Sequence, residues 1–381
     1  MGFFGEKEKD LSMKGKRNFF KTMNQKGFSN TLVIILALVI IGGIGGYFIF
    51  VKKSAVTLTS RQESTASNAP TDTSELVIQE TKEFNIKGLH PKFAPDGSKI
   101  LFEARGENEG LWIMNSDGSN LESIYKGKLS GVDDDEYSLD GKFIFVTTLL
   151  QTGSRFPGSN DEVLNVINTQ TNGAKQIFGP VKNILYTKWI SNNEVGFVYE
   201  NEMSRENFAI VDVNGTKKNY EDNGKPIFFY TSDRGTGAGD QSVIKSVTRS
   251  GTTKEITGAA FTEPALSPDG QKVVYRQYGE PGQLMTMSTD GSDKNVVITD
   301  YGAGDATWSP SGKIISYSVA KDDGHAIIEW DIYAINTDGT GKIKLTNSGK
   351  KFAAHPRWSP DGKKLVFDYN ETGSFGLIVF K

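Results

Sequence analysis

The sequence contains no cysteine and only three histidines in 381 residues. Without cysteine, the protein can form no disulfide bond, thiolate metal site or cysteine nucleophile. Hydrophobic residues make up 37% of the chain, which is low for a compact enzyme, whereas glycine occurs 42 times. This composition favours an all-β fold with many turns, and it suits an exported protein that needs no oxidative cross-links.

Known catalytic and nucleotide-binding motifs are also absent. The sequence has no G-x-S-x-G elbow, no Walker-type phosphate loop, no HExxH and no EF-hand calcium loop. Its S-P-D-G turns differ from the S-x-D-x-G turns of sialidase-type propellers. We therefore expect that the protein is not an enzyme and carries no cofactor.

Acidic residues outnumber basic ones outside the N-terminus. Residues 1–53 hold nine Lys and Arg against three Asp and Glu, which leaves 34 against 43 in the rest of the chain. Because neutralisation of phosphates dominates nucleic-acid affinity, an acidic body is a poor nucleic-acid binder. The charge distribution therefore excludes nucleic acid as a partner.

One long apolar run stands near the N-terminus. Thr31 to Val51 are 21 residues without a charge, enough to span a bilayer as a helix. Seven Lys and Arg precede this run and only two follow it closely, so the positive-inside rule places residues 1–30 in the cytoplasm. We expect an uncleaved signal-anchor, a flexible linker over residues 52–75, and an extracytoplasmic domain over residues 76–381 at the cell envelope.

The residues just before the apolar run offer a different interpretation. Lys26 to Phe28 resemble the prepilin-peptidase site of type IV pilin-like proteins. Those proteins usually carry Glu at the fifth residue from the cleavage site, and Leu32 stands there in this chain. Processing at this site therefore stays an open alternative.

The rest of the chain repeats one phrase. HPKFAPDGSKILF at residues 90–102 returns as HPRWSPDGKKLVF at residues 355–367, with related segments between them every 40 to 50 residues. A fixed period of this length indicates a repeat architecture. We use the position of the PDG aspartate as the reference position of each repeat. The seven reference positions are Asp96, Asp140, Asn192, Asn223, Asp269, Ser311 and Asp361.

Two columns of large apolar or aromatic residues support this alignment, as expected where one sheet packs on the next. Three residues before the reference stand Phe93, Tyr137, Trp189, Tyr220, Leu266, Trp308 and Trp358. Six residues after it stand Phe102, Val146, Val198, Phe229, Tyr275, Tyr317 and Phe367.

Each repeat reads as four antiparallel strands, which is one blade of a β-propeller. The second hairpin turns are Asx-Gly or Ser-Gly pairs, which supply the positive φ that tight turns require. There are seven first turns but six second turns, so the strand-like segment 75–87 should complete the last blade. We predict seven four-stranded blades. The fourth repeat is short of one strand, and six blades with an irregular insertion is the alternative.

The W-S-P-D-G-K phrase with its following strand and N-x-D-G turn resembles the repeat of TolB-type propellers, over essentially all of residues 76–381. This resemblance implies a periplasmic or extracellular interaction module, or the propeller half of a prolyl-oligopeptidase-like peptidase. The repeat is specific for the fold and much less so for the function.

A polar column lies six residues before the reference, where the innermost strand of a blade begins. We predict that these side chains surround one mouth of the central channel, and that the first and last members lie on adjacent blades. Two imidazoles with an acidic residue could hold a divalent metal or receive a cationic peptide end. The alternative is a structural role in every blade. The column contains His90, Asp134, Tyr186, Lys217, Glu263, Asp305 and His355.

Loops between the second and third strands should open on the same face as this column, and they are candidates for partner binding. Arg and aromatic side chains dominate binding hot spots. The loop candidates are Arg155, Phe156, Arg205, Arg234 and Trp330. The acidic run Asp133 to Glu136 is either a calcium-binding segment or a solvated loop.

We therefore predict a single-pass membrane protein whose β-propeller binds a protein or peptide partner in the cell envelope. The alternatives are a propeller hydrolase or lyase, and a carbohydrate-binding module, either of which would use the His and acidic residues of the channel mouth.

Overall fold

The computed structural model describes residues 69–130, 135–150, 161–201, 203, 205–233, 242–260, 264–277, 282–300 and 302–381. The predicted anchor, the pilin-like site and most of the predicted linker lie outside these residues. Within the described part, no helix is both long and apolar enough to cross a bilayer.

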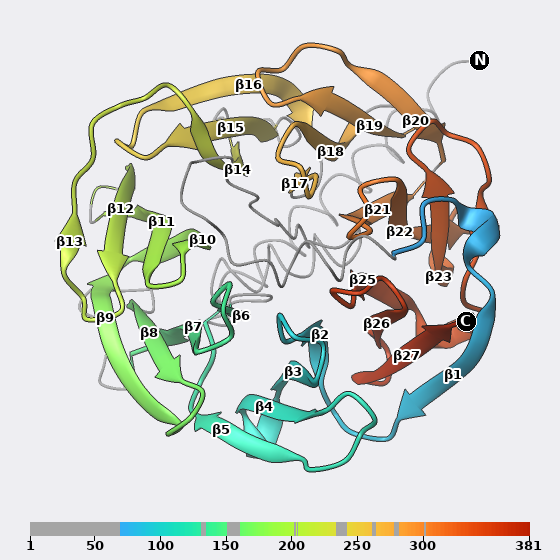
Figure 1. Cartoon of the computed structure of the whole chain (residues 1–381), viewed down its shortest axis with the longest axis horizontal. Helices are drawn as coiled ribbons and strands as arrows, with labels where there is room; N and C mark the ends of the chain where they lie inside the picture. Colours follow the sequence, from blue (N-terminus) through green and yellow to red (C-terminus); the bar gives the residue numbers. More distant parts are fainter. Residues whose placement is uncertain are drawn as a thin grey trace, which may run out of the picture. The chain divides into compact units, whose positions relative to one another are not determined.

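The described chain is an all-β propeller of seven blades around a central axis (Figure 1). Blade 1 contains β2 (Leu89–Phe93), β3 (Lys99–Ala104), β4 (Gly110–Asn115) and β5 (Glu122–Lys126). Blade 2 contains β6 (Asp135–Tyr137), β7 (Phe143–Leu149), β8 (Glu162–Asn168) and β9 (Gly173–Val181). Blade 3 contains β10 (Asn183–Ser191), β11 (Glu194–Glu200), β12 (Glu206–Asp212) and β13 (Lys217–Lys218).

The later blades follow the same order. Blade 5 contains β17 (Ala265–Leu266), β18 (Lys272–Gln277), β19 (Gln283–Ser288) and β20 (Asn295–Thr299). Blade 6 contains β21 (Ala303–Trp308), β22 (Ile314–Asp322), β23 (Ile327–Asn336) and β24 (Ile343–Lys344). The described short helices are η1 (Thr73–Glu75), η2 (Gly106–Asn108) and η3 (Gly349–Lys351).

Blade 4 has three described strands, β14 (Pro226–Asp233), β15 (Ser242–Thr248) and β16 (Thr253–Ala260). β14 follows the Asn223 turn and therefore corresponds to the second strand of the other blades. The predicted shortage of one strand is confirmed. The prediction for Lys217 is wrong, because this residue lies exposed in β13, the outermost strand of blade 3.

Blade 7 is completed from the other end of the described chain. β1 (Ile78–Phe84) pairs antiparallel with β27 (Ser374–Phe380). The order across the sheet is then β1, β27, β26 (Lys364–Tyr369) and β25 (Ala353–Trp358). Phe84 anchors this closure, with its ring 5.2 Å from that of Phe375. The predicted closure by an N-terminal strand is confirmed, and the count is seven blades rather than six.

The two apolar columns pack blade on blade, as predicted. Phe93 and Phe102 of blade 1 lie in one buried cluster with Val366 and Phe375 of blade 7. Two tryptophans of the first column also tie neighbouring blades through hydrogen bonds, since Trp308 Nε1 donates to Ala265 O and Trp189 Nε1 donates to Glu136 O, each over 2.9 Å. Burial and indole hydrogen bonding together explain why large aromatic residues recur at these positions.

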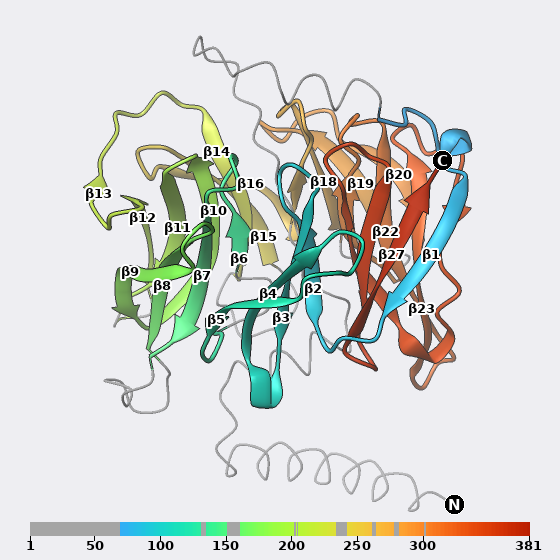
Figure 2. The ribbon, with the colours of Figure 1, turned by 60° about the horizontal axis from the view of Figure 1, so that its bottom comes forward.

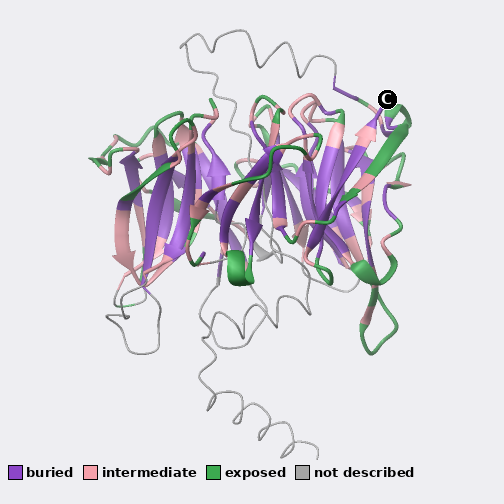
Figure 3. Cartoon of the chain, turned by 90° about the horizontal axis from the view of Figure 1, so that it is seen from below, coloured by how far each residue is buried: buried purple, intermediate pink, exposed green. Residues whose placement is uncertain are grey.

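The propeller has two distinct faces. The first and second hairpin turns lie on one face, which we call the turn face, and the loops between second and third strands lie on the other, which we call the loop face. In Figure 3 the loop face, with the exposed η2 of blade 1, lies below, and the turn face lies above. The described chain begins on the turn face, where Ala69 and Pro70 lie against Gly362 of blade 7 (Figure 2).

Candidate functional site

Three members of the predicted channel column share an unusual backbone. His90, Asp305 and His355 have φ values of 51, 48 and 50°, in the left-handed region that non-glycine residues seldom occupy. Each sits at a register shift between the first and second strands of its blade. The same bulge, with the same energetically costly backbone, therefore recurs at the same position of three blades.

The side chains of blades 7 and 1 meet in a buried cluster. The rings of His90 and His355 lie edge to face with centroids 4.8 Å apart. Asp368 of β26 lies against both: its carboxylate is 2.9 Å from His355 Nδ1 and accepts from the backbone N–H of His90 over 3.0 Å. The prediction that the two histidines lie on adjacent blades is confirmed.

Electrostatics favour the charged form of this cluster. Burial lowers the pKa of His355, but the carboxylates of Asp368 and Asp305 outweigh it and raise that pKa to about 9. The pKa of Asp368 is lowered, because His355 and His90 overcome the effect of its burial. His355 and Asp368 therefore form a buried ion pair at neutral pH.

A second carboxylate lies beside the other histidine. Glu103 Oε1 lies 3.4 Å from His90 Nδ1, and both side chains are buried. Burial acts to raise the pKa of Glu103, but His90, Arg105 and Lys92 lower it to about 2. Glu103 is therefore ionised.

Asp305 of blade 6 is fully buried and accepts a hydrogen bond from Ser318 Oγ over 2.6 Å. Its second oxygen, Oδ1, has no hydrogen-bond partner among the described residues. His90, Asp305 and His355 lie on the innermost strands of their blades, as predicted, but their side chains are buried and not exposed at a mouth of the channel.

The partners of the column were missed by the sequence analysis. Glu103, Ser318 and Asp368 each stand seven residues after their reference position, on the second strand. The signal was present, because each polar residue directly follows the large apolar residue of the second packing column. A polar column beside an apolar one on a buried strand indicates paired residues on the first and second strands.

The other predicted column members behave differently. Asp134 and Glu263 lie outside the described residues. Tyr186 is half-buried and packs on aromatic residues of blade 4, with its ring centroid 5.0 Å from that of Phe228. Its role is therefore packing between blades 3 and 4.

The described half of the acidic run is structural. Asp135 and Glu136 form part of β6, where both are buried. Lys92 Nζ lies 3.3 Å from Asp135 Oδ1, and Lys188 forms an ion pair with Glu136. These pairs join blades 1, 2 and 3, so the prediction of a solvated loop is wrong for both acidic residues.

The predicted loop residues also differ in how the structure describes them. Arg155, Phe156 and Arg234 lie outside the described residues. Trp330 is only 2% exposed and belongs to β23, so its prediction as a surface binding residue is wrong. Arg205 is exposed on the loop face of blade 3, where Asn201 Oδ1 accepts its backbone N–H over 3.1 Å.

The histidine cluster is also the one group in the described part of the chain with the geometry of a metal site. One ligand atom each from His90, His355 and Asp368 lie within 4.8 Å of one another. Imidazole nitrogens and a carboxylate oxygen suit zinc or manganese. A metal would have to displace the proton that His355 holds toward Asp368, so its binding would weaken as the pH falls.

Comparison with known proteins identifies the fold. No protein-family model matches the chain. Over 144 residues, 29% of the chain, it is 30% identical to YuxL of Bacillus subtilis, named as an uncharacterised peptidase, of which it covers 22%. Over 95 residues, 24% of the chain, it is 30% identical to the Tol-Pal system protein TolB of Francisella tularensis, of which it covers 20%. The chain thus spans about a fifth of the length of these relatives.

A solved structure with the same fold is oligogalacturonate lyase from Vibrio parahaemolyticus. The two share a TM-score of 0.56 at 12% identity, over 80% of this chain and 97% of the lyase. Identity at this level shows the shared fold and carries no chemistry.

Proposed function

We propose that this TolB-like β-propeller is a protein-binding module at the cell envelope, anchored in the membrane by Thr31–Val51 with the propeller outside the cytoplasm. Its repeat is similar to that of TolB, whose name assigns it to the Tol-Pal system. The anchor is supported by the uncharged run of 21 residues and by the positive charges before it.

The observation that carries the proposal is the exposed end of blade 3 on the loop face. Met203 is 69% exposed and Leu185 is 42% exposed, although both are large apolar residues. Arg205 is exposed two residues after Met203. Because Met and Arg are enriched at protein interfaces, this end of blade 3 is a candidate contact surface.

The absence of cysteine makes the membrane topology directly testable. A Glu107→Cys variant carries a single thiol in the exposed η2. In intact cells we expect labelling by a membrane-impermeant maleimide without lysis, given access through any outer membrane. Labelling only after the inner membrane is opened would contradict the proposed side.

The partner is tested with the full-length protein in its native membrane. Proteins cross-linked to the chain are identified, produced separately and measured for direct binding. We expect Arg205→Glu to weaken direct binding at least tenfold, and a matched charge reversal on the turn face, Lys272→Glu, to leave it unchanged. Equal binding by wild type and Arg205→Glu would remove the loop face from the proposal.

The histidine cluster favours a second candidate, a metal-dependent hydrolase or lyase. His90, His355 and Asp368 would hold the metal. Elemental analysis of the purified full-length protein decides this candidate. Stoichiometric metal that disappears in the His90→Ala, His355→Ala double variant would support it, and metal at trace level in the wild type after incubation with zinc or manganese would reject it.

A further inference from the structure

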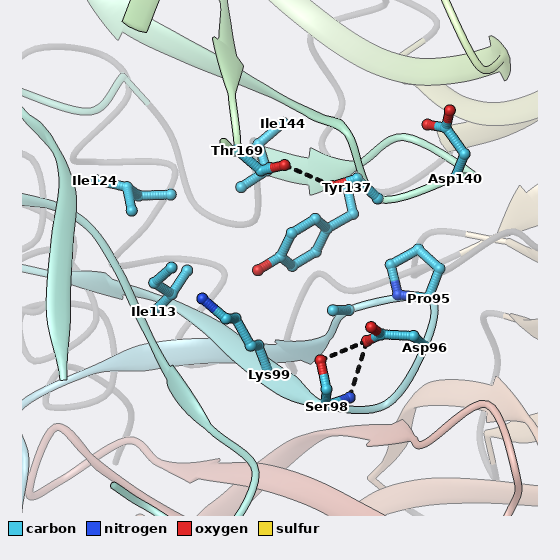
Figure 4. Close-up of a pocket in the computed structure, with 12 residues that line it drawn as sticks. Pro95, Asp96, Ser98, Lys99, Ile113, Ile124, Tyr137, Asp140, Ile144 and Thr169 are labelled. Carbon is cyan, nitrogen blue, oxygen red and sulfur yellow. Dashed lines mark hydrogen bonds between the residues drawn. The ribbon is translucent and has the colours of Figure 1, made fainter. Parts of the chain in front are cut away.

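We propose that a cavity between blades 1 and 2 on the turn face binds a short peptide from a partner protein, anchored by a small residue followed by proline. The cavity has a volume of about 210 Å³. Lys99 and the ring of Tyr137 project into it, with Ile113 and Ile124 beside them (Figure 4). It lies on the face opposite Met203 and Arg205, so this site is independent of the proposed loop-face partner.

The chain itself shows how the space at this position between two neighbouring blades, which we call the slot, can be filled by a peptide. Between blades 6 and 7, on the same face, residues 69–76 enter the corresponding slot. Ala69, Thr73 and Leu76 are 4%, 2% and 7% exposed, respectively. Ser311 Oγ donates to Pro70 O over 2.6 Å. The propeller therefore already holds a peptide segment between two of its blades.

The apolar floor of the two slots is built from equivalent positions. Gly362 and Leu365 stand one and four residues after the reference position of blade 7, and Gly141 and Ile144 hold those positions in blade 2. A Cβ at Gly362 would lie 2.9 Å from Ala69 Cβ and 3.1 Å from Pro70 Cδ, so glycine makes room for the Ala–Pro pair. A Cβ at Gly141 would meet only the Pro95 ring, at 3.5 Å.

The polar clamp is also repeated. Asn336 Oδ1 accepts the backbone N–H of Thr73 over 2.9 Å. Asn115 is its counterpart, since both residues stand two before the Asp-Gly turn of their blade. Asn115 Nδ2 donates to Ser119 Oγ, and among the described residues nothing donates to its Oδ1. From this equivalence in sequence, we expect the carbonyl oxygen of Asn115 to accept a peptide N–H.

Two residues differ between the open slot and the filled one. At the reference position, blade 1 has Asp96 where blade 6 has Ser311. Three residues later, blade 1 has Lys99 where blade 6 has Ile314. A carboxylate cannot donate to a peptide carbonyl as Ser311 does, but it accepts N–H groups and attracts cations. Asp96 and Asp140 give this cavity two carboxylates against the one ammonium group of Lys99, so it suits a small residue–proline pair beside a donor or basic residue, unlike the chain's own acidic segment.

The test uses the full-length protein and a synthetic probe. The probe is the peptide of residues 67–77, with Asp72 and Glu75 replaced by Lys and a photoreactive proline analogue at position 70. We expect the cross-link on residues 94–99 or 137–144. We also expect Lys99→Trp, which fills the cavity, to weaken binding of the non-photoreactive peptide at least tenfold.

The matched control is Lys272→Trp, which makes the same change at the equivalent position of blade 5. It should leave peptide affinity unchanged, and a peptide with Pro70 replaced by Asp should bind at least tenfold more weakly. Three results would overturn the proposal: no binding at millimolar peptide, cross-links confined to blades 6 and 7, or equal loss with Lys99→Trp and Lys272→Trp. If Lys99→Trp does not fold, the cross-link position decides alone.

Discussion

Blades 4 and 7 each have only three strands in their own stretch of the described sequence, yet they are incomplete in opposite ways. Blade 7 lacks its outermost strand and receives β1 from the beginning of the described chain. Blade 4 begins at the second-strand position with β14 and ends with β16, whose Ala260 pairs with Gln277 of blade 5. The missing outer strand of blade 7 is thus supplied by a distant segment, whereas no described strand takes the place of the missing inner strand of blade 4.

The inner walls of the two blades differ as well. Seven residues after the reference, blade 7 carries Asp368 in a buried ion pair, whereas blade 4 carries Tyr230 within an aromatic group. The repeats thus keep the residues that pack one blade on the next and vary those that face the axis.

The largest expected effect comes from removal of the closing strand. Replacement of residues 78–84 by a Gly-Ser segment of equal length removes Phe84 and leaves the edge of β27 unpaired. Loss of one buried phenylalanine alone costs about 3–5 kcal/mol. We expect the free energy of unfolding in urea to fall by more than about 4 kcal/mol. An unchanged unfolding curve would mean that blade 7 tolerates three strands as blade 4 does.

The next effect compares the two equivalent inner-wall residues. Asp368→Ala leaves the buried charge of His355 unpaired, which typically costs about 3–5 kcal/mol of unfolding free energy. Tyr230→Phe loses one hydrogen bond, from its hydroxyl to Glu206 Oε2 over 3.2 Å, at a cost of about 1 kcal/mol. Chemical denaturation measures both. Equal losses would show that the charged wall is no more important than the aromatic wall.

The charged wall should also make stability depend on pH. Because folding raises the pKa of His355 from 6.5 to about 9, its contribution is complete below pH 6.5 and is lost as the pH rises through 9. We expect wild type to lose up to about 3 kcal/mol more than His355→Gln between pH 7 and pH 10. Denaturation with a chelator present measures the difference, and parallel pH profiles would contradict the ion pair.

The smallest effect concerns Lys217. Because this residue is exposed on the outermost strand of blade 3, Lys217→Ala should change the free energy of unfolding by less than about 0.5 kcal/mol. Thermal unfolding checks this. A loss of more than about 2 kcal/mol would instead support a buried position for Lys217 at the inner wall of blade 4.

The repeat made most of the fold predictable. The Asp-Gly turns, with φ of 94° at Gly118 and 86° at Gly339, and the aromatic columns lie as their spacing indicated, because both depend on local backbone and pairwise packing. The first strand of blade 4 was not predictable. Asn223, Tyr220 and Phe229 fixed the turn and the second strand of this repeat, but residues 217–218 form β13 of blade 3 instead of a first strand.

The candidate site was predictable in position but not in environment. The repeat count placed His90 and His355 on adjacent blades. Their burial depends on a β-bulge, which their residue types do not predict. Asp368 and Glu103 required a pairing register between strands, which the sequence does not state. Trp330 was wrongly predicted to be exposed, because the sequence does not show whether an aromatic residue near a loop faces solvent or the core.

The most direct test of a binding module with an active loop face is site-specific photocross-linking in the native membrane. Full-length chains carry a photoreactive residue either at Glu107 on the loop face or at Asp290, an exposed turn-face residue of blade 5. We predict one partner captured from position 107 and not from 290, whose direct binding by the purified protein is lost with Arg205→Glu. Capture of the same proteins from both positions, with binding unaffected by Arg205→Glu, would contradict the proposed function.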